Sequence, residues 1–337
     1  MAQVASEPVA APAQPIGPEV GGEPSKQVVG RSPGQLFWRR FRRDKFAIAG
    51  IVFIVIMLFL AVAGGPLAAG ITGHGPNFIP TPLSLALAPD GLPIGPSIEK
   101  GYWFGVDTAG RDMFVRTIYG ARTSLMVALL ATGIAVLLGV SLGLIAGFYG
   151  GKIDTFISRV IDIVLSLPIL LLALGLAAAC SLSRTGCLGG LIRPGVVLVS
   201  YIIGLFSWPY LARIVRGQVL SLREKEFIEA ARAQGSGQGR IIFREVLPNV
   251  IAPIIVYTTL IIPNNILFEA ALSFLGVGVD PQTPSWGRML SEAGSGSLFT
   301  VAWWMMLFPG LFLFLTTLAF NLVGDGLRDA LDPRTAR

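Results

Sequence analysis

Two long apolar runs without a charged residue limit this chain to a membrane fold. They are "FAIAGIVFIVIMLFLAVAG" (46–64) and "SLMVALLATGIAVLLGVSLGLIAGFY" (124–149). A helix of roughly 20 apolar residues crosses a bilayer core about 30 Å thick, so each run is long enough to span one. Only 14% of the residues are charged, far below the roughly 25% of soluble domains. The sequence therefore predicts an all-α membrane protein.

Four further runs bring the predicted number of spans to six. They lie at about 156–179, 195–212, 251–275 and 301–323. Cytoplasmic loops accumulate Lys and Arg, and with the N-terminus inside most of the 26 basic residues fall on the inner side. We therefore predict that both termini are cytoplasmic. This distribution also argues against nucleic acid as the reason for the net charge of +6.

Composition divides the chain into five expected segments. They are a disordered cytoplasmic tail (1–35), a basic anchor with the first span (36–65), an extracytoplasmic segment (66–119), a transmembrane domain of five helices (120–325) and a cytoplasmic C-terminal tail (326–337). The tail is rich in Ala, Pro, Glu and Gly and has no apolar core. The basic anchor meets the membrane where anionic headgroups favour it.

Small residues and prolines indicate how the spans pack. Gly139, Gly143 and Gly147 recur every four residues, so they share one helix face and let a neighbouring backbone approach closely. Prolines interrupt the later spans and permit bends there. Such bends favour a bundle that lines a pathway, although static membrane helices also contain proline. The prolines are Pro168, Pro209, Pro253, Pro263 and Pro309.

Few polar residues fall inside the spans. Arg159 and Asp162 are three residues apart, a spacing that predicts an ion pair across one helical turn. Asn264, Asn265 and Glu269 follow the break expected at a proline. These three could line a substrate pathway or cap a kinked helix.

The sequence offers little for catalysis, metal binding or nucleotide binding. His74 is the single histidine, and "GVSLG" (139–143) places a serine inside an apolar helix rather than on an exposed turn. "GFYGGKID" (147–154) lacks the spacing of a phosphate-binding loop. We predict no cofactor and no metal in this chain, so any ATP and magnesium must be bound by another subunit. Cys180 and Cys187 could form a disulfide on the outer side or remain unpaired.

A polar link, residues 221–248, separates two apolar spans. Ser221 and Glu224 have the spacing of a capping box, which predicts that a helix starts there. Gly235 suits the left-handed end of that helix, and a second helix is expected to end at Pro248. The link is thus predicted to form two short cytoplasmic helices.

The first of these helices has an apolar side. Phe227, Ile228 and Ala231 share it, with Ala230 beside them. Small alanines allow close docking into a groove of another protein. The alternative is an amphipathic helix that lies against lipid.

The stretch "EAARAQGSGQGRIIFREVLP" resembles the EAA loop of ABC importer permeases. The pattern of that loop is E-A-A-x3-G-x9-I-x-L-P. Glu245 stands where the pattern has Ile, which weakens any claim about that one position. The matching residues are Glu229, Ala230, Ala231, Gly235, Leu247 and Pro248.

Four other segments are similar to the C-type permease subunit of dipeptide and oligopeptide importers. "FGVDTAGRDMFVRTIYGARTSL" (104–125) resembles its G-T-D-x-x-G-R-D segment, with Val106 in place of Thr. The others are "AGFYGGKIDTFISRVIDIVLSLP", "ALSFLGVGVDPQTPSWGRML" and "FNLVGDGLRDALDPR". Together they cover most of residues 36–334, without the N-terminal tail and the cysteine-bearing loop.

The resemblance implies a type I importer permease in the cytoplasmic membrane of a prokaryote. The chain would pair with a second, B-type permease to form the translocation pathway. Two ATPase subunits would bind beneath it, with the EAA loop as a coupling helix in a groove of the ATPase. An extracytoplasmic binding protein would deliver the peptide, and ATP would favour one of two arrangements of the bundle.

Three alternatives compete with this prediction. Relatives in the same family move nickel or metal chelates, and the sequence does not exclude them. An ion-driven carrier would favour an ionisable residue at the membrane midplane and paired inverted repeats, neither of which is clear here. A membrane enzyme lacks site residues.

Overall fold

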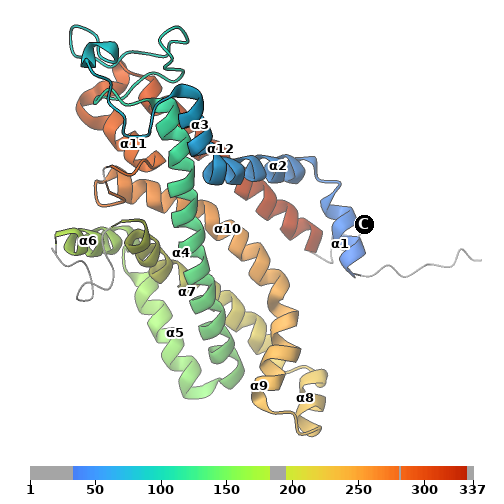
Figure 1. The fold of residues 1–337 in the computed structure, drawn as a ribbon. Coiled ribbons are helices and arrows are strands. Elements are labelled where there is room, and N and C mark those ends of the chain that lie inside the picture. Colours follow the sequence, from blue (N-terminus) through green and yellow to red (C-terminus); the bar gives the residue numbers. More distant parts are fainter. Residues whose placement is uncertain (1–32, 183–194, 281, 332–337) are drawn as a thin grey trace, which may run out of the picture.

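The computed structural model describes residues 33–182, 195–280 and 282–331, which form a bundle of long helices (Figure 1). Within these ranges there is no β-strand, and this confirms the predicted all-α fold. Five helical rods are long and apolar enough to cross a membrane. They are α2 with α3 (Lys45–Phe59 and Gly65–Thr72, joined by the π-helical segment Leu60–Gly64), α4 (Met113–Tyr149), α7 (Val196–Arg223), α9 with α10 (Gln238–Arg240 and Leu247–Phe274, joined by the π-helical segment Ile241–Val246) and α12 (Trp304–Leu331).

The span expected at about 156–179 is broken into two helices. α5 (Gly151–Ser166) and α6 (Ile169–Leu182) meet at a bend of 84°. Leu167 is extended (φ −86°, ψ 143°), as expected for a residue that precedes a proline, here Pro168. The other prolines do not break their helices, so the break expected at Pro263 is wrong. Pro209, Pro253, Pro263 and Pro309 all lie inside continuous helices.

α4 and α7 pack closely along their length, and glycine makes this possible. Gly139, Gly143 and Gly147 all face α7. A Cβ atom added to Gly143 would lie only 2.7 Å from the backbone oxygen of Ala212. From the other side, a Cβ on Gly204 of α7 would lie 2.8 Å from a backbone oxygen of α4. These contacts are the close helix approach that the four-residue spacing predicts.

Side-chain caps set where several helices begin. The carboxylate of Asp44 accepts backbone N–H groups of α2, and that of Asp112 does the same for α4. Ser285 caps α11 (Trp286–Gly294). Each such cap contributes about 1 kcal/mol. Because of the Asp112 cap, α4 already begins inside the segment expected to be extracytoplasmic, and α12 likewise continues beyond residue 325.

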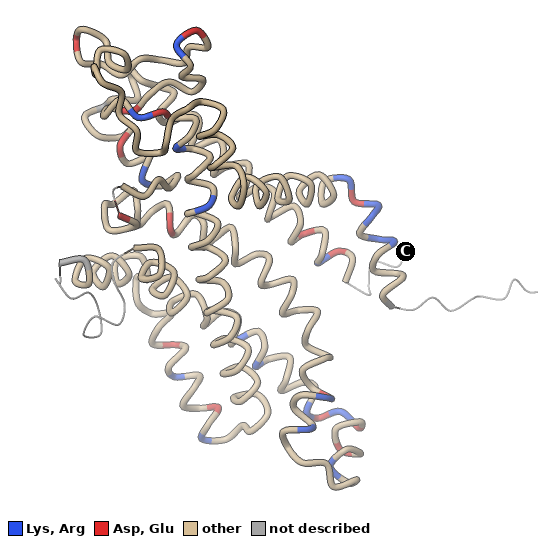
Figure 2. Tube along the Cα trace, viewed as in Figure 1, with Lys and Arg blue, Asp and Glu red and all other residues tan. Residues whose placement is uncertain are grey.

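Polar segments gather at the ends of the bundle. The link with α8 (Glu226–Ala233) and α9 extends from one end, whereas residues 73–112 and α11 lie at the other (Figure 1). α1 (Pro33–Phe41) packs beside the last turns of α12. Charged residues cluster at α1 and around α8, and the lengths of α2 and α10 between the ends are nearly free of them (Figure 2).

Candidate functional site

In the polar link between α7 and α10, helix α8 is fixed to the bundle by one buried isoleucine. Ile228 of α8 is fully buried, and it packs in a cluster that includes Phe148 of α4, Val219 of α7 and Ile241. Burying such a side chain contributes about 1.5–3 kcal/mol. α8 is therefore a fixed feature of the surface rather than a loosely attached loop.

Gly235 ends α8, as the sequence predicts. Its φ of +76° lies in the left-handed region, which glycine adopts at no steric cost. The N–H of Gly235 donates to the oxygen of Arg232 (2.9 Å), and the N–H of Ser236 donates to that of Ala231 (3.0 Å). These two bonds form a Schellman motif, which satisfies carbonyl groups at the helix end and turns the chain sharply.

The predicted capping box at the start of this helix is wrong. Ser221 lies within α7, which continues to Arg223, and α8 begins only at Glu226. The carboxylate of Glu224 instead accepts the Nε–H of Arg223 at 3.0 Å. Because α7 is unbroken at Ser221, its backbone N–H groups are already used and need no cap.

Pro248 does not end a helix, which is a second difference from prediction. The rod is continuous from Gln238 to Phe274, and Pro248 lies in its interior. The wider π-helical turn just before the proline accommodates it, because the N–H of Leu247 reaches back to the oxygen of Ile242. The side chain of Asn249 donates to the oxygen of Glu245 at 2.6 Å. The second half of the polar link, from Gln238 on, therefore passes into the membrane as one rod.

The apolar side of α8 divides into an inward and an outward part. Ile228 and Ala231 face the chain's own hydrophobic cluster, so Ile228 is buried and Ala231 is half-buried. Phe227, 40% exposed, and Ala230 point outward together with the carboxylate of Glu229. Phe227 and Ala230 are therefore the exposed part of this side, and Ala231 is its half-buried part.

Asn265 joins three helices inside the bundle. Its side chain is buried, and its amide donates to Thr132 Oγ1 of α4 at 2.9 Å. Its carbonyl oxygen accepts from Ser207 Oγ of α7, also at 2.9 Å. Asn264, by contrast, is exposed, and its amide donates to the oxygen of Leu260. Of the two neighbours, only Asn264 faces away from the chain's own helices.

Glu269 is also buried within this chain. One carboxylate oxygen accepts from Ser124 Oγ of α4 at 2.9 Å, and the other accepts from Ser273 Oγ at 2.7 Å. Ser124 Oγ in turn accepts the N–H of Trp286 at the start of α11. Asn265 and Glu269 thus connect helices of one subunit.

Asp162 finds its partner on another helix. Its carboxylate accepts from Arg213 of α7 at 2.7 Å, and both side chains are about half exposed. The predicted pair with Arg159 is therefore wrong, because α7 runs beside α5 and brings an arginine closer.

The disulfide considered between Cys180 and Cys187 cannot be followed, since Cys187 lies outside the described residues.

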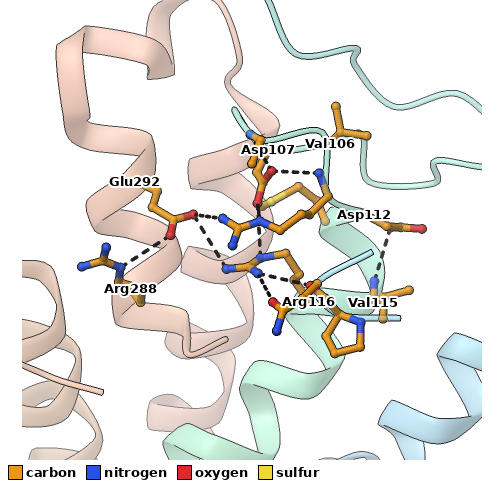
Figure 3. A network of polar contacts seen from close by, with 12 residues as sticks. Val106, Asp107, Asp112, Val115, Arg116, Arg288 and Glu292 are labelled. Atoms are coloured by element: carbon orange, nitrogen blue, oxygen red, sulfur yellow. Dashed lines mark hydrogen bonds and ion pairs between the residues drawn. The ribbon is translucent and has the colours of Figure 1, made fainter. Parts of the chain in front are cut away.

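A buried network of charges at the opposite end was not predicted (Figure 3). Arg116 of α4 and Asp107 are both fully buried, and Arg116 Nε lies 3.3 Å from Asp107 Oδ2. Arg111 donates to the same oxygen at 2.6 Å and to Glu292 of α11 at 3.2 Å. Arg288 completes the network, 3.5 Å from Glu292. The network connects the segment before α4 to α11. These two segments lie far apart in the sequence, so no local sequence pattern could have revealed the contact.

His74 is used in packing at the same end. Its ring stacks on Phe78 and Tyr102, with centroids 5.1 and 5.3 Å apart, and its Nδ1 lies 3.2 Å from Asp112 Oδ2. Burial raises the pKa of Asp112, and the hydrogen bond to His74 opposes this shift. Burial likewise raises the pKa of Tyr102, with the nearby Asp112 charge adding to the effect.

Among the described residues, no group of three or more potential ligands could hold a metal ion.

Comparison with known proteins identifies the family. The sequence model described as the inner membrane component of binding-protein-dependent transport systems matches residues 139–337. The chain belongs to this permease family. A second model, the N-terminal membrane domain of oligopeptide transport permease C, matches residues 32–86.

Curated relatives of the permease cover nearly its whole length. A dipeptide transport system permease protein, DppC, from Alkalihalophilus pseudofirmus is 41% identical, with 92% of this chain and 93% of the relative aligned. DppC from Bacillus subtilis is 39% identical over 89% of this chain and 85% of the relative. A glutathione transport system permease protein, GsiD, from Pectobacterium atrosepticum is 37% identical over 90% and 92%.

A solved structure supports the fold of the permease. The inward-facing methionine ABC transporter MetNI aligns with a TM-score of 0.53 and 17% identity, covering 65% of this chain and 97% of that chain. At this identity the match shows a shared architecture and nothing about substrate. The predicted type I importer permease fold is thereby confirmed.

Proposed function

We propose that this permease forms half of the translocation pathway of an ATP-driven importer for short peptides. Relatives that align over about nine-tenths of this chain are named for dipeptide and for glutathione transport. Both substrates are short peptides, since glutathione is a tripeptide. This agreement favours peptides over nickel chelates. Transport proceeds by alternating access, with ATP shifting the bundle between two arrangements.

The geometry of the polar link carries the proposal. α8 is anchored to the bundle through Ile228 and turns at Gly235 into the rod that begins at Gln238 and crosses the membrane. An exposed surface at Phe227 and Ala230 seats in a groove of the ATPase. When the ATPase moves α8, the rod carries that displacement into the membrane along α10. Glu229, Gly235, Leu247 and Pro248 maintain the shape of this connection.

An importer of this kind needs other subunits besides this permease. The sequence lacks a phosphate-binding loop, so two ATP-binding cassette subunits bind ATP and magnesium. A second, B-type permease completes the pathway, and Asn264 of α10 lines it as an exposed polar side chain. An extracytoplasmic peptide-binding protein docks at the end formed by residues 73–112 and α11. This orientation places both termini in the cytoplasm, in keeping with the basic residues around α1 and α8 (Figure 2).

Purification in a mild detergent tests this proposal. The chain is isolated from its native membrane, co-purifying proteins are identified by mass spectrometry, and ATP hydrolysis is measured with and without vanadate. We expect a homologous permease and one or two ATPases, with vanadate-sensitive hydrolysis. Repeated isolation of the chain alone, together with transport in vesicles without ATP, would contradict the proposal.

A further inference from the structure

α1 is a fixed part of the bundle. Phe41 is only 2% exposed and packs with Ala47 of α2 and Ala330 of α12. Gly326 brings α12 close to this corner, because a Cβ added there would lie 2.4 Å from Ala47 Cβ and 3.0 Å from Asp44 Oδ2. The helix therefore presents its remaining face in one defined orientation.

The end of α1 and the turn into α2 carry positive charge without a partner in this chain. Arg39, Arg42, Arg43 and Lys45 are exposed, and none of them makes an ion pair with any residue that the structure describes. Asp44 lies among them, but its carboxylate caps α2 by accepting the N–H groups of two residues there. The carboxylate of Asp44 is thus occupied by the helix cap. The four cations remain available to an anionic partner outside the chain.

Apolar side chains are interleaved with these cations. Leu36 is 39% exposed and Trp38 is 49% exposed. The guanidinium carbon of Arg42 lies 4.8 Å from the centroid of the Trp38 ring, a cation–π contact that holds both groups on the same face. Indole rings are enriched at the membrane–water interface, where one side is apolar and the other wet.

The position of α1 places this face at the membrane surface. Only three residues separate it from Lys45, where the apolar rod of α2 and α3 begins. The link with α8 and α9 emerges from a different part of the molecule (Figure 1). The charged face is therefore next to lipid headgroups and apart from the expected contact with the ATPase.

We propose that the end of α1 and the turn into α2 form a preformed binding site for anionic phospholipid headgroups. Arg39, Arg42, Arg43 and Lys45 bind the phosphate groups, and guanidinium groups suit phosphate because they donate two parallel hydrogen bonds. Trp38 and Leu36 insert among the headgroups and upper acyl chains. The bound lipid then holds the corner of α1, α2 and α12 at a fixed depth. This inference does not depend on the identity of the transported substrate.

Lipid selectivity of the purified complex tests the proposal. The complex is reconstituted in nanodiscs with mixtures of phosphatidylglycerol and phosphatidylcholine, and the lipids that remain bound in the gas phase are counted by native mass spectrometry. A variant with Arg39, Arg42, Arg43 and Lys45 all replaced by Gln should lose at least tenfold of the preference for phosphatidylglycerol, given roughly fivefold per basic residue near an anionic surface. Replacing the three arginines by Lys keeps the charge but loses the paired hydrogen bonds, so it should retain only part of the preference.

A matched control separates a site from net charge. Lys152→Gln with Arg159→Gln removes two exposed basic residues from α5 and should leave the preference unchanged. In addition, brominated phosphatidylglycerol should quench the fluorescence of wild type more than that of Trp38→Phe. Equal loss in the control, no preference in wild type, or crosslinking of α1 to an ATPase subunit would overturn the proposal.

Discussion

At the residue scale, Gly235 is a position in the polar link where the backbone itself disfavours a side chain. Its φ of +76° is costly for any residue with a Cβ atom, by about 1–2 kcal/mol for left-handed backbone and more for a β-branched side chain. We expect Gly235→Val to lower peptide uptake while the chain still inserts in the membrane. The measurement is uptake together with the ATPase rate of the purified complex.

Gly237 provides the control for this prediction. Its φ is −64°, and no atom lies within 4 Å of a Cβ added there. Gly237→Val should therefore retain nearly wild-type uptake. Normal uptake and ATPase rate in Gly235→Val would show that the turn does not constrain coupling.

Two neighbouring alanines should respond differently to the same substitution. Ala230 is exposed, whereas Ala231 is half-buried beside the cluster around Ile228. Ala230→Arg should abolish uptake and leave the thermal stability of the permease unchanged, because it blocks only docking. Ala231→Arg should also lower stability, by about 1–3 kcal/mol, because the larger side chain cannot fit against the cluster.

Thermal unfolding of the two purified variants distinguishes these effects. If Ala230→Arg transports like wild type, Phe227 and Ala230 do not form the docking surface. The sequence could not separate the two alanines. Helical spacing places Phe227, Ile228 and Ala231 on one broad side, and only the path of the neighbouring helices shows which part faces inward.

At the scale of elements, the α4–α7 contact depends on glycine. A Cβ atom on Gly143 would lie 2.8 Å from Val215 Cβ, so Gly143→Val must push the helices apart. We expect a loss of about 1–3 kcal/mol, as for other overpacked interiors, measured as a lower unfolding temperature of the purified permease. Gly133→Val on the same helix meets no atom within 4 Å and should have little effect.

The buried charge network gives a second prediction for α4. Arg116→Leu would leave Asp107, which is fully buried, without one of its two cationic neighbours. Breaking a buried pair in this way costs about 3–5 kcal/mol, so the yield of folded permease should fall sharply. Arg122→Leu removes an exposed arginine from the same helix, and its yield should be normal. Equal yields would mean that the network does not hold the outer end together.

Membrane-spanning helices were predictable where a sequence run is long, apolar and free of charged residues. The runs at 46–64 and 124–149 are long and uncharged, and both form membrane-spanning helices. The bend in the third run was not predicted, because apolar length alone does not distinguish a straight span from α5 and α6 meeting at 84°. The prolines did not resolve this, since Pro168 breaks its helix while Pro209 and Pro309 do not.

At the scale of the whole molecule, the polar ends have different origins. The link with α8 could be found in the sequence because it is one contiguous polar segment between apolar runs. The opposite end is assembled from residues 73–112 and α11, which meet only in the folded chain through Arg111 and Glu292. Contiguous features were therefore predictable, and contacts across the bundle required the structure.

The central claim is that α8 transmits ATP-driven movement to the membrane helices of a peptide importer. The most direct test is uptake of a radiolabelled dipeptide into proteoliposomes that carry the purified complex, with its binding protein outside and ATP inside. We predict uptake that requires ATP and the binding protein, and that is lost in Ala230→Arg. Uptake that continues without ATP, or that Ala230→Arg leaves unchanged, would contradict the account.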